Sequence, residues 1–171
     1  MREEYKINYY PLLEINLLSI FHNARLIVNE ALKYGIMIDG VTKVTLGDSK
    51  IAKLLLKAGV RGISDSRVES IRKMKEEGIN TEYTLLRLPS LSEINEVLCW
   101  TEISLNSELK TLEELNFYAE RMKKRHKVII MVEMGDLREG IWRRDELEYV
   151  TEKVLKMKNI ELFGIGTNFT C

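Results

Sequence analysis

The chain has 171 residues, which allows one domain with a core large enough to fold alone. Its 26 basic and 26 acidic residues cancel, so charge gives no reason to expect a nucleic acid or an acidic membrane surface as a partner. Cys99 and Cys171 lie far apart, without disulfide or metal-ligand spacing, which fits a reducing cytoplasm. The N-terminus lacks the apolar segment of a signal peptide, and no apolar run is long enough to span a bilayer.

The pattern of apolar residues predicts strands and helices in alternation along the chain. Alternating Leu13, Ile15 and Leu17 predict a leading strand. Six further strands are predicted at 36–43, 60–65, 81–88, 101–105, 126–134 and 160–168. Helices are predicted at 20–33, 49–57, 66–78, 90–100, 111–124 and 145–158.

Several helix ends carry recognisable capping residues. Asp48 or Ser49 is suited to cap the second helix, and Gly59 is suited to end it. The segments 66–69 and 90–93 both have the form of a capping box, in which a serine hydroxyl and a glutamate satisfy free amides.

Unbroken alternation of strands and helices predicts an α/β fold with a parallel sheet and helices outside it. The absence of a reversal in the pattern favours a (β/α)8 barrel of the TIM type over an open doubly wound sheet. A closed barrel needs eight strands and typically ~250 residues. With about six parallel strands, residues 1–171 are therefore expected to be an incomplete barrel.

Lys43 is the first candidate for chemistry because it ends the apolar run 36–43. The carboxyl ends of strands form the active edge in α/β proteins. A partly desolvated lysine at that edge can act as a nucleophile toward a carbonyl, although a solvent-exposed lysine at a strand end would look the same. Arg87, at the end of the strand 81–88, is a candidate ligand contact or a buried ion-pair partner.

Two glycine-containing segments follow the last two strands. In the segment 133–140, Gly135 and Gly140 bracket Arg138, whose guanidinium matches carboxylate, phenolate or phosphate oxygens. The segment 164–168 brings small residues and an amide to the same edge, where a bulge or a barrel corner is the alternative. His22 and His126 have no partners at metal-ligand spacing, so no metal site is expected. The sequence also contains neither a phosphate-binding loop nor a nucleophile elbow.

Taken together, these stretches resemble the fold-type III pyridoxal-phosphate enzymes of the alanine racemase group, and most closely the ornithine racemase branch. The similar stretches are Gly40-Val41-Thr42-Lys43, Gly47-Asp48, Ser64-Asp65-Ser66-Arg67, the segment 102–108, the segment 135–140, and Gly164-Ile165-Gly166-Thr167-Asn168. The segment 135–140 is the most specific of them, and the resemblance runs from about residue 10 to residue 171.

The resemblance implies roles for individual residues. Lys43 would form a Schiff base with pyridoxal 5'-phosphate and would act as one acid/base on the substrate α-carbon. Arg138 would meet the phenolic oxygen of the cofactor and the substrate carboxylate, which Arg87 would also contact. Thr167 and Asn168 would lie beside the cofactor, with Asn168 where alanine racemases have a histidine. Gly47 stands where they have a tyrosine, and both departures argue against alanine as the substrate.

The resemblance also implies a racemase of ornithine or a related basic amino acid, cytoplasmic and homodimeric as a full-length protein. The C-terminal β domain of such enzymes, whose tyrosine reaches the partner subunit's active site, is absent from this sequence, and so is the phosphate site. This chain alone is therefore expected to be inactive. Two other functions remain open: a non-catalytic pyridoxal-phosphate carrier and a structural or regulatory fragment without a ligand.

Overall fold

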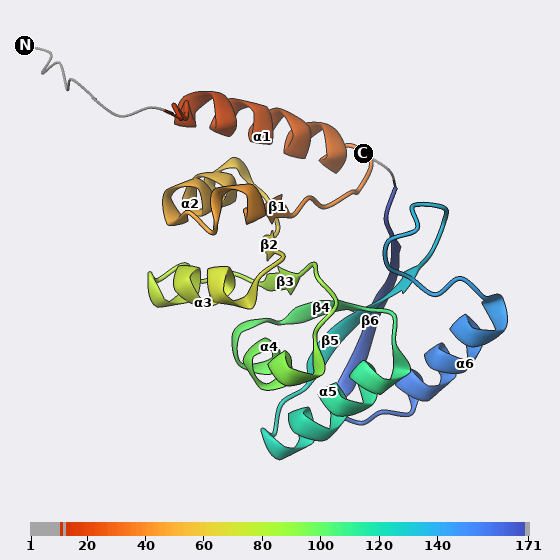
Figure 1. The fold of residues 1–171 in the computed structure, drawn as a ribbon. Helices are drawn as coiled ribbons and strands as arrows, with labels where there is room; N and C mark the ends of the chain where they lie inside the picture. Colours follow the sequence, from red (N-terminus) through yellow and green to blue (C-terminus); the bar gives the residue numbers. More distant parts are fainter. Residues whose placement is uncertain (1–10, 12, 170–171) are drawn as a thin grey trace, which may run out of the picture.

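A computed structural model describes residue 11 and residues 13–169, and its central feature is one sheet of six parallel strands. The strands are β1 (Gly40–Val41), β2 (Ile63–Asp65), β3 (Tyr83–Leu85), β4 (Ile103–Asn106), β5 (His126–Val132) and β6 (Ile160–Thr167). They lie side by side in chain order, as Figure 1 shows. All five strand pairs are parallel, so every connection crosses back over the sheet. The alternation predicted from the sequence is therefore confirmed.

The first helix precedes β1, and the others lie in the connections between successive strands. They are α1 (Leu17–Leu32), α2 (Ser49–Ala58), α3 (Val68–Glu76), α4 (Ile94–Trp100), α5 (Leu109–Arg121) and α6 (Arg144–Leu155), with 3-10 turns η1 (Lys43–Thr45) and η2 (Leu91–Glu93). Helices α2 to α5 follow one another along one side of the sheet (Figure 1). Among the described residues, no helix combines the length and the apolar character needed to cross a membrane.

The hydrophobic core lies between the sheet and its helices. Ile63, Tyr83 and Val128 from the strands are fully buried, as are Met74 and Leu112 from the helices. Burying one such apolar side chain contributes about 1.5–3 kcal/mol relative to leaving it exposed. The core therefore fixes the strands, and with them the loops at their carboxyl ends.

The leading strand predicted from Leu13, Ile15 and Leu17 is wrong. Residues 13–16 belong to no strand, and Leu17 already begins α1. The side chain of Asn16 explains the difference, because it accepts a hydrogen bond from the Ser19 amide at 3.0 Å and caps the helix. Helix formation thus begins three residues before the predicted start at residue 20.

The strand predicted at 36–43 is much shorter than expected. Only Gly40–Val41 form β1, and Lys43 lies in η1, just beyond the strand. The backbone ladder to β2 extends a little further, from Arg61 N–H to Ile38 O and from Thr42 N–H to Ser64 O. Beyond Thr42 the chain turns into η1, where the Thr45 amide donates to the Thr42 carbonyl at 3.0 Å, so the pairing with β2 stops there.

The helix caps were predicted only in part. Asp48 caps α2 by accepting hydrogen bonds from the Lys50 and Ile51 amides at 2.9 and 3.0 Å, and Gly59 ends the helix with a φ of 103°. The two capping boxes are wrong. The N-cap of α3 is Arg67, whose own amide is taken by Asp65, and the Ser90 hydroxyl donates to the Glu93 carboxylate rather than accepting from an amide.

The amino ends of the strands carry a network of ion pairs. Arg61 donates to both oxygens of Asp39 at 2.9 and 2.6 Å and to Glu82 at 2.6 Å, and Lys127 also pairs with Glu82. The hydrogen bond to Asp39 raises the pKa of Arg61 above its usual value. Positive and negative groups are matched at this end of the sheet, in contrast to the carboxyl end.

Candidate active site

A cavity of about 530 Å³ opens at the carboxyl ends of the strands. Its wall includes Lys43, which follows β1, and Arg87, which follows β3. Arg138 and Glu139, from the loop after β5, complete the polar part of the wall. Side chains separated by nearly a hundred residues therefore meet at one place because parallel strands end at the same edge of the sheet.

Lys43 is placed by a buried hydrogen bond next to it. Thr42 is fully buried, and its hydroxyl donates to the carboxylate of Asp65 at 2.8 Å. Asp65 is itself buried, and its other oxygen accepts from the Arg67 amide at 3.1 Å. This bridge ties the end of β1 to the end of β2, so the backbone that carries Lys43 is fixed. The described residues leave the Lys43 side chain exposed, so they do not supply the desolvation that the sequence suggested.

Gly47 adopts a backbone conformation that suits glycine and lies close to α3. Its φ is +64°, and a Cβ atom would lie 3.0 Å from the Ser70 carbonyl oxygen in α3. The turn after Lys43 therefore packs directly against α3. Any larger residue at position 47 would have to push that helix away.

The loop 133–140 is held from inside by the carboxylate of Glu133. One oxygen of Glu133 accepts from the amides of Gly135 and Leu137, at 2.5 and 3.0 Å, and the other accepts from the Arg138 amide at 3.2 Å. The hydrogen bond from Leu137 is the largest cause that lowers the pKa of Glu133 below its usual value, and the bonds from Gly135 and Arg138 add to it. The backbone at Arg138 is thereby attached to the end of β5.

The base of the same loop is closed by backbone bonds. The Glu133 amide donates to the Ile141 carbonyl at 3.1 Å, and the Ile141 amide donates to the Met131 carbonyl at 2.8 Å. A Cβ atom at Gly140 would lie 2.5 Å from the Glu133 nitrogen, so only glycine fits where the chain returns to the strand. The two glycines recognised in the sequence therefore shape the loop that presents Arg138.

The Arg138 side chain is half exposed and lies between two acids. Its guanidinium is 3.6 Å from Asp136 and 3.7 Å from Glu139, longer than a direct hydrogen bond. The Asp136 oxygen on that side is buried and has no hydrogen-bond partner among the described residues. Arg138 thus keeps donors free to meet an oxygen-bearing ligand in the cavity.

The end of β6 joins the site through Asn168. Its amide nitrogen donates to the Glu139 carboxylate at 2.6 Å, and Thr167 directly precedes it. The pairing of β5 with β6 skips Phe163, so the bulge considered for this strand is present. Thr167 and Asn168 are not part of the cavity wall formed by Lys43 and Arg138, and Asn168 is connected to that wall through Glu139.

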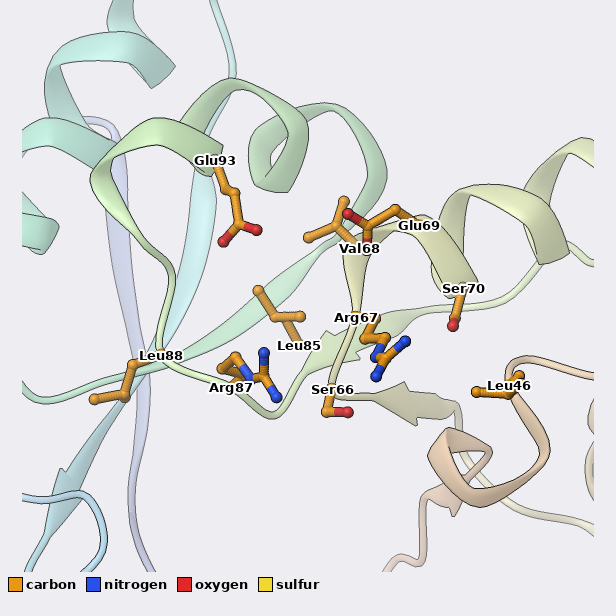
Figure 2. Close-up of a pocket in the computed structure, with 10 residues that line it drawn as sticks. All are labelled: Leu46, Ser66, Arg67, Val68, Glu69, Ser70, Leu85, Arg87, Leu88 and Glu93. Atoms are coloured by element: carbon orange, nitrogen blue, oxygen red, sulfur yellow. The ribbon is translucent and has the colours of Figure 1, made fainter.

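A second cavity, of about 420 Å³, adjoins the first and is shown in Figure 2. Ser66, Arg87 and Leu88 line both cavities. Arg67 lines the second one, and within the described part of the chain neither Arg67 nor Arg87 forms an ion pair. The guanidinium groups of Arg67 and Arg87 are therefore free to meet a ligand at the carboxyl edge of the sheet.

Glu133 and Arg67 were not identified as site residues from the sequence. The sequence does contain a signal for Arg67, since it belongs to the quoted stretch Ser64-Asp65-Ser66-Arg67. Glu133 begins the segment 133–140 that the sequence singled out, but its role depends on a loop that folds back onto it. The histidines take no part: His126 is buried beside Ser104, and no cluster of three potential metal ligands occurs among the residues whose positions are described.

Comparison with known proteins shows the family of the chain. Residues 15–171 match the family model described as "Alanine racemase, N-terminal domain". The chain is 40% identical to a lysine racemase of Thermotoga maritima and 39% identical to an ornithine racemase of Acetoanaerobium sticklandii, in each case over 95% of this chain and 45% of the relative. The chain thus spans a little under half the length of the curated relatives that it matches.

Solved structures give the same fold. An alanine racemase of Clostridium difficile 630 superposes with a TM-score of 0.81 at 20% identity, over 90% of this chain and 41% of that one. A histidine racemase of Leuconostoc mesenteroides gives a TM-score of 0.80 at 16% identity, over 91% and 42%. The sheet is therefore the first part of a TIM-type barrel. The carboxyl ends of its strands lie at one end of that barrel. The chain belongs to the alanine racemase N-terminal domain family.

Proposed function

We propose that this chain is the N-terminal part of a pyridoxal-phosphate-dependent racemase acting on lysine, ornithine or a related basic amino acid. The observation that carries the proposal is the cavity that brings the amine of Lys43 and the guanidinium of Arg138 together. The similarity to a lysine racemase and an ornithine racemase supports the substrate class. The protein is further proposed to work in the cytoplasm as a homodimer with a C-terminal β domain.

The residues of the cavity fit pyridoxal 5'-phosphate chemically. The cofactor offers an aldehyde, for which an amine is the matching group, and Lys43 is the lysine on the cavity wall. It also offers anionic oxygens, for which the unpaired guanidinium of Arg87 and the half-exposed one of Arg138 are suited. When bound, the cofactor supplies an electron sink that makes the substrate α-C–H acidic enough to be removed.

The chain's own residues would then perform binding and proton transfer. The Lys43 amine would hold the cofactor and would take and return the α-proton on one face. Arg138 would bind the phenolic oxygen and the substrate carboxylate, with Arg87 beside it, while Thr167 and Asn168 would contact the cofactor. Racemisation needs a second proton-transfer group on the opposite face, proposed to come from a partner subunit.

A racemisation assay tests the function. The full-length protein, supplied with pyridoxal phosphate, is expected to interconvert the L and D forms of lysine or ornithine. Chiral chromatography measures the two forms over time. Lys43→Ala should abolish the activity, whereas Lys50→Ala, an exposed lysine on α2, should not change it. Cofactor binding without racemisation of any amino acid would refute this proposal and support a non-catalytic carrier.

A further inference from the structure

The second cavity adjoins the Lys43 cavity and shares part of its wall. We propose that it receives the substrate side chain and that Glu69 and Glu93 select a cationic end group. This proposal rests on the function proposed above. Ser66, Arg87 and Leu88 belong to both walls, so a molecule held at Lys43 has the second cavity directly beside it. At about 420 Å³, the cavity has space for an extended aliphatic chain.

The two ends of the second cavity differ in charge. In the view of Figure 2, Ser66, Arg67 and Arg87 lie at one end, while the carboxylates of Glu69 and Glu93 lie at the other. The positive end is the one shared with the Lys43 cavity, because Ser66 and Arg87 line both. A carboxylate near Lys43 would therefore meet guanidinium groups, and a cation would be favoured at the opposite end, where the exposed side chains of Glu69 and Glu93 lie.

Apolar side chains lie between these two ends. Leu85 stands midway between Arg87 and Glu93 in Figure 2, and Val68 lines the same space. Both are almost fully buried, at 2% and 6% exposure, so the core holds them in place. Such a surface suits methylene groups, which gain by leaving water.

The two glutamates are available for a ligand. Neither Glu69 nor Glu93 forms an ion pair with any residue that the structure describes, and the one side-chain partner of Glu93 there is the Ser90 hydroxyl. Glu69 lies in the first turn of α3 and Glu93 at the start of α4, positions where the helix dipole favours a negative charge. A protonated amine is the natural partner for such carboxylates.

Lysine and ornithine have a carboxylate at one end, methylene groups in the middle and an ammonium group at the other end. The cavity offers the matching groups in the same order: guanidinium, apolar surface and carboxylate. Alanine has no group that would reach the far end. The cavity thus provides a physical reason for a basic substrate that depends on residues of this chain.

The experiment compares lysine with norleucine, which has a similar chain but ends in a methyl group. In the full-length protein loaded with pyridoxal phosphate, Glu69→Gln combined with Glu93→Gln should lower the ratio of kcat/KM for lysine to that for norleucine at least about tenfold. Glu113→Gln, an exposed glutamate on α5 outside both cavities, serves as the matched control and should leave the ratio unchanged.

A binding measurement separates recognition from chemistry. Calorimetric titration with racemic lysine, in which no net reaction occurs, should show weaker binding by the double variant and unchanged binding of racemic norleucine. Equal losses for lysine and norleucine, or no loss for either, would overturn this inference while leaving the racemase proposal intact. Absence of racemisation in the unmodified protein would instead refute the proposed function itself.

Discussion

At the scale of single residues, Lys43 is proposed to carry the chemistry. The carboxylate of Glu133 holds the backbone of Arg138 in place. Glu133 accepts three amide hydrogen bonds from the loop that carries Arg138. A carboxylate can receive all three because it is an acceptor at both oxygens. We therefore propose that Glu133 is a positioning residue, which would act on a ligand through Arg138.

Glu133→Gln tests this role. A glutamine can keep one oxygen as the acceptor for Gly135 and Leu137, but its NH₂ group would face the Arg138 amide, which is also a donor. We expect the KM for the amino acid to rise about tenfold, with a smaller effect on kcat. Glu133→Ala, which removes all three bonds, should have a larger effect on KM in the same steady-state assay.

A double-mutant cycle distinguishes positioning from a general structural effect. If Glu133 acts through Arg138, Glu133→Gln should change KM little in a protein that already carries Arg138→Ala. Additive losses from the two substitutions would mean that Glu133 works independently of Arg138.

His126 gives a prediction about pH and stability. Burial, with a smaller contribution from the positive charge of Lys124, lowers the pKa of His126 from 6.5 to about 4. The unfolded chain therefore binds the proton more readily than the folded chain between these values. Stability should fall as the pH is lowered from 6.5 to about 4, by roughly 3 kcal/mol in total, and should be unaffected by this group above pH 6.5.

Chemical unfolding across this pH range measures the effect. His126→Gln removes the titrating group, so the part of the pH dependence due to His126 should disappear in that variant. A variant whose stability falls with pH as steeply as that of the unmodified protein would show that other groups are responsible.

At the scale of elements, the helix cap at Asp48 forms, whereas the cap predicted at Ser90 does not. Asp48 caps α2 with two amide hydrogen bonds, whereas Ser90, in the predicted capping box, makes none to an amide. Asp48→Ala should lower the free energy of unfolding by about 1 kcal/mol, and Ser90→Ala by a few tenths. Urea titration of both variants checks the difference, and equal losses would contradict the assignment of the caps.

The elements show which parts of the fold a sequence can predict. The number and order of the six strands followed from periodicity, which depends on which side chains the core buries. The leading strand was predicted wrongly because the alternation at 13–17 does not reveal the helix that Asn16 caps and Leu17 begins. The length of β1 was predicted wrongly because Lys43 begins a 3-10 turn that takes the chain out of the sheet, which the apolar pattern does not show.

The candidate site was predictable to a similar extent. Lys43, Arg87 and Arg138 could be expected to converge because each follows a parallel strand, and they do line one cavity. Glu133 could not be expected, because the sequence does not show how a loop folds onto the residue before it. The connection of Asn168 to the site through Glu139 depends on side-chain geometry in the same way.

At the scale of the whole molecule, an incomplete barrel leaves a strand edge and apolar side chains uncovered. The outer strand β6 has Ile165 at 61% exposure, and Phe169 beyond it is 76% exposed. Open edges and exposed apolar groups favour pairing with other chains. We therefore expect the 171-residue chain, produced alone, to self-associate.

Light scattering coupled to size-exclusion chromatography tests this expectation. Ile165→Lys places a charge on the exposed edge and should shift the population toward smaller species. Lys156→Arg on the surface near α6 keeps the charge and should leave the distribution unchanged. A compact monomer at every concentration would show that the exposed edge of the sheet does not cause self-association.

The central claim is that the amine of Lys43 is the group that holds pyridoxal phosphate. The most direct measurement is borohydride reduction of the full-length protein mixed with the cofactor, followed by digestion and mass spectrometry. We expect to find the cofactor mass, at one equivalent per chain, on the peptide that contains Lys43. Attachment at a different lysine, or no attachment under conditions where the cofactor binds, would contradict it.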